Sequence, residues 1–363
     1  MRAPGRNRTS PAERVTDLRT RLGSVELPNP VMTAAGTSGH GAELGSYFDL
    51  GDLGAVVVKS LSAGPWAGSP SPRVCPVPGG MLNGVGLQGP GIEAWAADDV
   101  DGLGGLERAG ARVVVSIWGR RVDDYAEAAS LLAAALRGRP ANVVAVEVNV
   151  SCPNLEDRSR MFAHSPQATA AAIKAAAKCG LPLWAKLSPN TSDLIEVAGA
   201  ARDAGAEALT LVNTLLGLAI DERTWRPSLG AGGGGLSGPA LHSVALRAVF
   251  DCRSAYPDVP IIGVGGIADG AGAMRMLLAG AQAVQVGTAT LADPRAPVRV
   301  LAGLRRILEG GGDDALPVVP SLSEVIGAAH RRANGPPGVA ESQRVAESQR
   351  VAESHRVEEK KEQ

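Results

Sequence analysis

Aromatic residues are scarce in this chain, and their scarcity limits what can fill its core. Phe, Trp and Tyr make up 3% of the 363 residues, although 45% of the chain is hydrophobic. The core must therefore consist mainly of Val, Leu, Ile and Ala, which suit parallel strands covered by helices. A chain of this length can form one barrel of roughly 250 residues or two ordinary domains.

Closely spaced cysteines are also missing. Cys75, Cys152, Cys179 and Cys252 lie far apart and form no Cys-x-x-Cys pair. This spacing argues against a metal knuckle, an iron–sulfur cluster or a disulfide framework within the chain. The five histidines show neither a His-x-x-x-His nor a His-Glu pattern, so we expect no metal site. A reducing, cytoplasmic location fits this cysteine usage.

Long apolar runs and an excess of one charge are absent as well. No stretch approaches the roughly 18 consecutive apolar residues of a membrane span, so none is expected. The chain has 36 Lys and Arg against 37 Asp and Glu, a formal net charge of -1, so nothing suggests nucleic acid as its main partner. Residues 1–11 are basic and polar without an apolar segment, which argues against a secretory signal.

The two ends have compositions typical of unstructured chain. Residues 1–16 are rich in Arg, Pro and Ser, and we expect a disordered N-terminal tail there. The hexapeptide Val-Ala-Glu-Ser-Gln-Arg at 339–344 repeats at 345–350 and nearly at 351–356. A period of six gives no continuous apolar stripe on a helix. We therefore expect one domain over residues 17–311 and a disordered C-terminal extension over 312–363.

Between the ends, short β-branched runs alternate with Ala- and Leu-rich stretches typical of helices, such as 123–136, 166–179 and 192–204. The candidate strands are 31–35, 55–59, 112–117, 143–149, 181–187, 208–213, 260–264 and 283–286. Eight βα units in about 290 residues predict an α/β fold, the (β/α)8 TIM barrel, with an open doubly wound sheet as the alternative. The segment between Lys59 and Arg112 has no long helical pattern, and we expect an active-site insertion there, after the second strand.

Glycine-rich turns follow the last two predicted strands. Gly265 and Gly266 come after the seventh strand, and Gly287 and Thr288 after the eighth. Turns at these two positions form the usual phosphate site of such barrels, because backbone N–H groups can approach the phosphate oxygens closely. The alternative is that these glycines only make tight turns.

Two lysines and an asparagine end other strands. Lys59 and Lys186 are expected inside the barrel mouth, where an ammonium group is costly unless it meets an anion or an electron-rich ring. One could stabilise negative charge on a flavin, and the other could bridge flavin and substrate. The alternative for each is a lysine paired with a nearby carboxylate. Asn213 is either a ligand-binding amide or a residue that starts a turn.

The most informative motif is Asn-Val-Ser-Cys-Pro-Asn at 149–154, directly after the fourth predicted strand. Asn149 and Asn154 carry donors and acceptors that could hold a planar polar ring. Cys152 could exchange a proton or attack as a nucleophile. The alternative is a small buried thiol in a turn that Pro153 terminates.

Taken together, these motifs resemble dihydroorotate dehydrogenase of class 1B, over roughly residues 24–310. The most specific pieces are Met-Leu-Asn-Gly-Val-Gly-Leu-Gln at 81–88, the motif at 149–154, and Gly-Leu-Ser-Gly-Pro-Ala at 235–240. The resemblance implies an FMN barrel that oxidises dihydroorotate to orotate in pyrimidine synthesis. It also implies a homodimer, within a heterotetramer whose second subunit carries FAD and a [2Fe-2S] cluster and passes the electrons to NAD.

The resemblance also implies roles for individual residues. Cys152 would be the general base that removes the C5 proton, while a hydride passes from C6 to the flavin. The substrate-binding residues would be Lys59, Asn83, Asn149, Asn154, Asn213 and Thr214. The cofactor-binding residues would be Ala35, Gly36, Lys59, Ser60, Asn149, Lys186, Val212, Gly238, Gly265, Gly266, Gly287 and Thr288.

Comparison with related families narrows the expected substrate. The membrane-associated class carries Ser at the position of Cys152, and dihydropyrimidine dehydrogenase has His at the position of Asn154, so Asn154 favours an orotate-type ring. The chain departs from its family at Ser116, where Asn is usual, and at Trp118, where a small residue is usual. The loop at 155–160 reads Leu-Glu-Asp-Arg-Ser-Arg, where the family has a Gly pair.

Three other functions compete with this prediction. The first is a flavin oxidoreductase that acts on another dihydropyrimidine. The second is a dihydrouridine synthase, which would need a basic surface that faces RNA and that the charge balance does not supply. The third is an inactive barrel kept as a scaffold, although such a protein has no chemical need for Cys152, two lysines and four asparagines.

Overall fold

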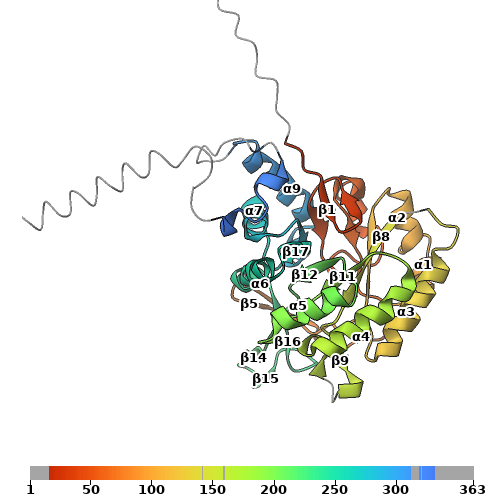
Figure 1. Ribbon diagram of the computed structural model, residues 1–363. Helices are drawn as coiled ribbons and strands as arrows, with labels where there is room; N and C mark the ends of the chain where they lie inside the picture. Colours follow the sequence, from red (N-terminus) through yellow and green to blue (C-terminus); the bar gives the residue numbers. More distant parts are fainter. Residues whose placement is uncertain (1–15, 141, 158–159, 312–318, 320, 332–363) are drawn as a thin grey trace, which may run out of the picture.

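The computed structural model describes residues 16–140, 142–157, 160–311, 319 and 321–331 (Figure 1). Eight parallel strands form one sheet in the order β3-β18-β17-β12-β11-β8-β7-β4, and a parallel bridge between Met32 and Ala55 joins its two ends. The barrel strands are β3 (Val31–Thr33), β4 (Val56–Val57), β7 (Val113–Ile117), β8 (Val143–Asn149), β11 (Leu183–Lys186), β12 (Ala208–Leu211), β17 (Ile261–Val264) and β18 (Ala283–Val286). The predicted (β/α)8 barrel is confirmed.

Helices surround this barrel (Figure 1). They are α1 (Ile92–Ala97), α2 (Leu103–Arg108), α3 (Val122–Ala135), α4 (Pro166–Ala176), α5 (Leu194–Asp203), α6 (His242–Ala255), α7 (Gly270–Ala279), α8 (Thr288–Ala292) and α9 (Ala296–Leu308). The start of α4 shows a side-chain cap: the Ser165 side chain accepts a hydrogen bond from the Ala168 N–H, and Pro166 occupies the first turn. No helix in these described ranges has the length and apolarity that crossing a bilayer requires.

A hairpin of β1 (Thr20–Leu22) and β2 (Val25–Leu27) lies at one end of the barrel. Its side chains Leu22, Val25 and Leu27 are buried in one cluster with the barrel-interior residues Met32 and Trp184. Because strand residues alternate in direction, every second residue of the barrel strands fills this interior. The amino-terminal end of the barrel is therefore packed with apolar side chains.

The predicted insertion forms part of a second sheet at the opposite end of the barrel (Figure 1). It contributes β5 (Val74–Val77) and β6 (Gly80–Asn83), which join β16 (Gly234–Ser237) and β13 (Leu215–Gly217) in the antiparallel order β13-β16-β6-β5. Two further pairs lie nearby: β14 (Ile220–Asp221) with β15 (Arg226–Pro227), and β9 (Pro153–Asn154) with β10 (Arg160–Met161).

Residues 321–331, which lie beyond the domain boundary that we expected at residue 311, pack against the barrel. Leu322 and Val325 are buried against the barrel, and the Gly327 N–H donates to the Leu277 carbonyl at 2.9 Å. The Thr16 hydroxyl donates to the Val319 carbonyl at 2.9 Å. Ile326 also packs against the main hydrophobic cluster. The hexapeptide repeat and residues 1–15 lie outside the described residues.

Candidate active site

A cavity of about 420 Å³ opens at the carboxyl end of the barrel strands. All of the predicted site residues line it except Cys152 and Asn154. Those that line it are Ala35, Gly36, Lys59, Ser60, Asn83, Asn149, Lys186, Val212, Asn213, Thr214, Gly238, Gly265, Gly266, Gly287 and Thr288. Most of these residues follow the parallel barrel strands, whose carboxyl ends meet at one end of the barrel. Asn83 comes from the second sheet, and Gly238 directly follows that sheet's β16.

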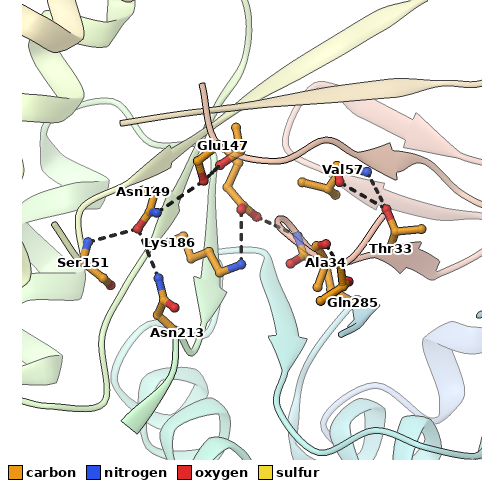
Figure 2. Close-up of polar contacts among 12 residues, drawn as sticks. Thr33, Ala34, Val57, Glu147, Asn149, Ser151, Lys186, Asn213 and Gln285 are labelled. Carbon is orange, nitrogen blue, oxygen red and sulfur yellow. Dashed lines mark hydrogen bonds and ion pairs between the residues drawn. The ribbon is translucent and has the colours of Figure 1, made fainter. Parts of the chain in front are cut away.

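Hydrogen bonds fix an array of amides and hydroxyls on the cavity wall (Figure 2). The Asn149 side-chain oxygen accepts from Asn213 Nδ2 and from the Ser151 N–H, both at 3.1 Å. Asn149 Nδ2 donates to Ser60 Oγ at 3.4 Å, and Ser60 Oγ bonds Ser116 Oγ at 2.9 Å. Ser116, where relatives usually have Asn, thus lies behind the wall and orients Ser60.

The two predicted lysines have different surroundings. Lys186 is buried with its ammonium 3.4 Å from a carboxylate oxygen of Glu147, which is itself fully buried and accepts from Gln285 Nε2 at 2.7 Å (Figure 2). Lys59 forms no ion pair with any carboxylate in the described ranges. Burial lowers the pKa of Lys59, and the nearby Lys186 lowers it further. Lys186 is therefore balanced by a carboxylate, whereas Lys59 brings an uncompensated positive charge to the cavity.

The glycines after β17 have backbone conformations that side chains rarely adopt. Gly265 has φ +140° and Gly266 has φ +65°. A Cβ at Gly265 would lie 2.6 Å from the Ala245 Cβ, and one at Gly266 would lie 2.7 Å from the His242 Cβ. A side chain fits at neither position, because this turn packs closely against the start of α6, and both glycines line the cavity.

Contacts across the mouth join the second sheet to the barrel. Thr288 Oγ1, at the start of α8, donates to Ser237 Oγ on β16 at 2.7 Å. Within the second sheet, Asn83 Nδ2 donates to the Gly235 carbonyl at 3.2 Å. Asn190, which the motifs did not reveal, donates from Nδ2 to the Thr214 carbonyl at 2.9 Å and thereby positions Thr214. Nothing in the sequence near Asn190 distinguishes it from an ordinary loop residue.

Cys152 and Asn154 lie behind the cavity wall. The Cys152 side chain is fully buried, and its Sγ donates to the Asn149 carbonyl at 3.4 Å. Burial raises the pKa of the Cys152 thiol to about 12, although hydrogen bonds from Tyr125 and the Gly119 N–H and the charge of Lys59 lower it. The Asn154 side-chain oxygen accepts from the Glu156 N–H at 3.0 Å.

The unusual Trp118 also lies outside the cavity lining. It is buried and packs edge-on against Trp66, with ring centroids 5.8 Å apart, and the Arg120 guanidinium lies over the Trp66 ring at 5.2 Å. The Leu155 N–H donates to the Arg120 carbonyl at 2.9 Å. Trp118 therefore supports the segment that holds the loop after Asn154 and does not reshape the cavity.

The fold and the cavity place the chain in the class of (β/α)8 enzymes, with glycine-rich turns, two lysines and several amides around one pocket. The dihydroorotate dehydrogenase family model matches residues 17–308. The chain therefore belongs to the dihydroorotate dehydrogenase family, whose members are flavin-dependent oxidoreductases, and the predicted resemblance is confirmed.

Three relatives share the name dihydroorotate dehydrogenase B (NAD(+)), catalytic subunit. The Desulforudis audaxviator protein is 45% identical over 311 residues, which cover 85% of this chain and 96% of the relative. The Pelobacter propionicus protein is 44% identical over 316 residues, which cover 86% of this chain and 98% of the relative. The Alkaliphilus metalliredigens protein is 43% identical over 294 residues, covering 81% and 94%.

Proposed function

We propose that this chain is the catalytic subunit of an FMN-dependent dihydroorotate dehydrogenase, which oxidises dihydroorotate to orotate in pyrimidine biosynthesis. The observation that carries the proposal is that one cavity brings together an anion-binding glycine turn, an uncompensated Lys59 and a hydrogen-bonded set of amides. Family membership and the names of close relatives support the same reaction.

The cavity has residues that fit FMN. Gly265, Gly266, Gly287 and Thr288 would hold the phosphate, because all four line the cavity in turns that follow the last two barrel strands. The flavin ring would contact Ala35, Gly36, Lys59, Ser60, Asn149, Lys186, Val212 and Gly238. Bound FMN would supply a two-electron acceptor.

The remaining polar residues suit a ring that carries a carboxylate and an imide. Lys59 would pair with the substrate carboxylate, since it has no carboxylate partner in the described part of the chain. Asn83, Asn149, Asn213 and Thr214 would donate to and accept from the ring, because amide side chains offer both functions. Asn154 would join them when its loop closes over the substrate.

Cys152 would act as the general base and accept the C5 proton on its sulfur. The sulfur lies behind Asn149, so the segment after β8 must turn it toward the cavity during the reaction. Two hydrogens leave the substrate in total: one reaches Cys152 as a proton, and the other leaves C6 as a hydride.

The words "catalytic subunit" and "NAD(+)" in the names of the relatives support a second protein as the electron carrier. We propose a homodimer of this chain with a partner subunit that carries FAD and a [2Fe-2S] cluster and passes the electrons to NAD. A cytoplasmic location fits the free thiols Cys75, Cys152, Cys179 and Cys252.

Anaerobic titration tests this function. The purified chain should release FMN on denaturation, identified by its mass, and the folded protein's oxidised-flavin absorbance should bleach when dihydroorotate is added. Cys152→Ala should slow bleaching by at least about 100-fold while FMN stays bound. Cys252 is a buried thiol on α6, and Cys252→Ala should leave the bleaching rate unchanged. Near-normal bleaching by Cys152→Ala would show that the base is another group.

Two other outcomes would point elsewhere. A flavin that stays oxidised with dihydroorotate but is reduced by another dihydropyrimidine would favour a different substrate. A colourless protein that takes up no FMN would favour a scaffold role.

A further inference from the structure

Two buried side chains meet at the main-chain carbonyl of Asn149. Tyr125 on α3 donates its hydroxyl to this oxygen at 2.8 Å, and the Cys152 thiol donates to it at 3.4 Å. Both side chains are fully buried, and neither lines the cavity. The Tyr125 hydroxyl therefore lies beside the thiol that we assign as the base.

The surrounding residues hold the Tyr125 ring in place. Phe162 packs edge-on against it with ring centroids 5.3 Å apart, and the Phe162 N–H donates to the Cys152 carbonyl at 3.2 Å. A Cβ at Gly119 would lie only 3.1 Å from Tyr125 Cδ2. The ring is fully buried and closely packed, so its hydroxyl hydrogen is the part that can change direction.

A carbonyl oxygen only accepts hydrogen bonds, so it suits a neutral thiol but repels a thiolate. A tyrosine hydroxyl is a donor whose hydrogen rotates, and it can turn from the carbonyl to a charged sulfur. The alternative is a structural role, since a buried tyrosine hydroxyl usually finds a partner. The two roles differ in what happens when Cys152 loses its proton.

We infer that Tyr125 is a positioning residue whose hydroxyl changes its hydrogen-bond acceptor when Cys152 loses or gains its proton. Its hydroxyl donates to the Asn149 carbonyl while the sulfur is protonated, and to the sulfur while it is a thiolate. After the sulfur has turned toward the cavity, taken the substrate's C5 proton and returned, its S–H donates to the Asn149 carbonyl, and the tyrosine hydrogen returns to that carbonyl. The inference rests on the proposed function, because it takes Cys152 as the base.

The groups around the Cys152 thiol favour its ionised form, as this role of Tyr125 requires. Tyr125 and the Gly119 N–H both lower the pKa of Cys152, against burial, which raises it. Lys59 is the charged group that faces the thiol from β4's end, and it also lowers the pKa of Cys152. Burial raises the pKa of the Tyr125 phenol, and the charges of Cys152 and then of Asp124, on α3, raise it further. Tyr125 is the side-chain donor in this set.

Tyr125→Phe removes the hydroxyl and keeps the ring. Anaerobic FMN reduction by dihydroorotate should slow roughly 10- to 100-fold, as expected for a lost hydrogen bond to a charged group. The deuterium isotope effect at C5 should increase while that at C6 does not, because only proton removal becomes harder. The dissociation constant of orotate should stay unchanged.

Tyr256→Phe is the matched control. Tyr256 also donates its hydroxyl to a backbone carbonyl, that of Ile195 at 2.9 Å, and neither residue lines the cavity. Its removal should leave the rate and both isotope effects as they are. A wild-type rate in Tyr125→Phe, or a slow rate with an unchanged C5 isotope effect, would overturn the inference.

A second measurement needs no change at Tyr125. The chain has three tyrosines, so 3-fluorotyrosine labelling gives three fluorine resonances, and Tyr47→Phe and Tyr256→Phe assign them. Cys152→Ala should move the Tyr125 resonance and leave the other two in place; an unmoved Tyr125 resonance contradicts the contact. If Cys152→Ala itself keeps normal reduction rates, the proposed base fails. If only Tyr125→Phe is normal, the role of Tyr125 alone fails.

Discussion

Asn149 contributes to two environments at once. Its side-chain amide lines the cavity and bonds Asn213 and Ser60, while its carbonyl lies behind the wall and accepts from Tyr125 and Cys152. A single residue therefore connects the groups proposed to bind the substrate with the group proposed to take its proton. Repositioning Asn149 would disturb both, so its replacement cannot separate binding from catalysis.

The raised pKa of Cys152 predicts the pH dependence of the reaction. A protonated thiol cannot accept a proton, and burial favours that neutral form, with a pKa of about 12. Raising the pH increases the thiolate fraction, so anaerobic FMN reduction should accelerate by up to about tenfold per pH unit. Stopped-flow measurement across the stable pH range checks the slope.

Cys252 supplies the control for this pH dependence. Burial also raises the pKa of Cys252 to about 12, but the residue does not line the cavity. Cys252→Ala should keep the same slope. A reduction rate independent of pH in the unsubstituted protein would refute the assignment of a buried thiol as the base.

At the scale of elements, an ion pair and a hydrogen bond join three strands inside the barrel. β8 carries Glu147, β11 carries Lys186 and β18 carries Gln285, and the three side chains form one buried chain of contacts. A buried charge that loses its partner is strongly unfavourable. This network fixes the lysine whose ammonium reaches the cavity.

A double-mutant cycle on this pair should reveal its coupling. Glu147→Gln and Lys186→Met should each lower the free energy of unfolding by about 3–5 kcal/mol, because each leaves one buried charge uncompensated. The double variant should lose much less than the sum. Urea unfolding of the cofactor-free proteins measures all three values.

Glu107→Gln provides the comparison on the outer surface of the barrel. Glu107 pairs with Arg139 at 3.0 Å, and both side chains are partly exposed, so the loss should be about 1 kcal/mol or less. Additive losses in the Glu147 and Lys186 cycle would show that the two charges do not stabilise one another.

The barrel strands could be predicted because their β-branched runs are local features of the sequence. All eight appear in the structure, although several are shorter than their runs. The second is the shortest: β4 covers only Val56–Val57, and the Lys59 N–H donates to the Gly39 carbonyl outside the sheet. Glu147 could have been suspected from a carboxylate within an apolar strand. Its partners could not, because Gln285 lies 138 residues further along the chain.

The direction of side chains after a strand was harder to predict. The motif at 149–154 placed Cys152 near the cavity, but the sequence does not specify that the sulfur points to the Asn149 carbonyl. That direction depends on Tyr125 and Phe162, which come from other elements. Sequence patterns identified the groups of the site, and tertiary packing decided which of them face the cavity.

At the scale of the whole molecule, the segment at 321–331 belongs to the folded unit. Leu322 is 2% exposed and Val325 is 4% exposed, both within the main hydrophobic cluster. Asp17 pairs with Ser321 in a parallel bridge, so the two ends of the described chain meet. The segment closes the outer layer where the chain leaves the barrel.

Leu322→Ala should lower the free energy of unfolding by about 2–4 kcal/mol, because it removes buried methyl groups and leaves a cavity. Leu218→Ala is the matched control, since Leu218 is 60% exposed and should change stability by less than about 0.5 kcal/mol. Denaturant unfolding measures both. Equal effects of the two substitutions would show that the 321–331 segment does not contribute to the folded unit.

The hairpin at the amino-terminal end of the barrel limits how substrate can enter the cavity and how product can leave it. That end is filled by apolar side chains of the hairpin and the barrel, Leu22, Val25, Leu27 and Trp184. The barrel interior is therefore closed at its amino-terminal end. A molecule that leaves the cavity must use the mouth through which it entered. Product must therefore depart before the next substrate can arrive, and a protein seated over the mouth would control both events.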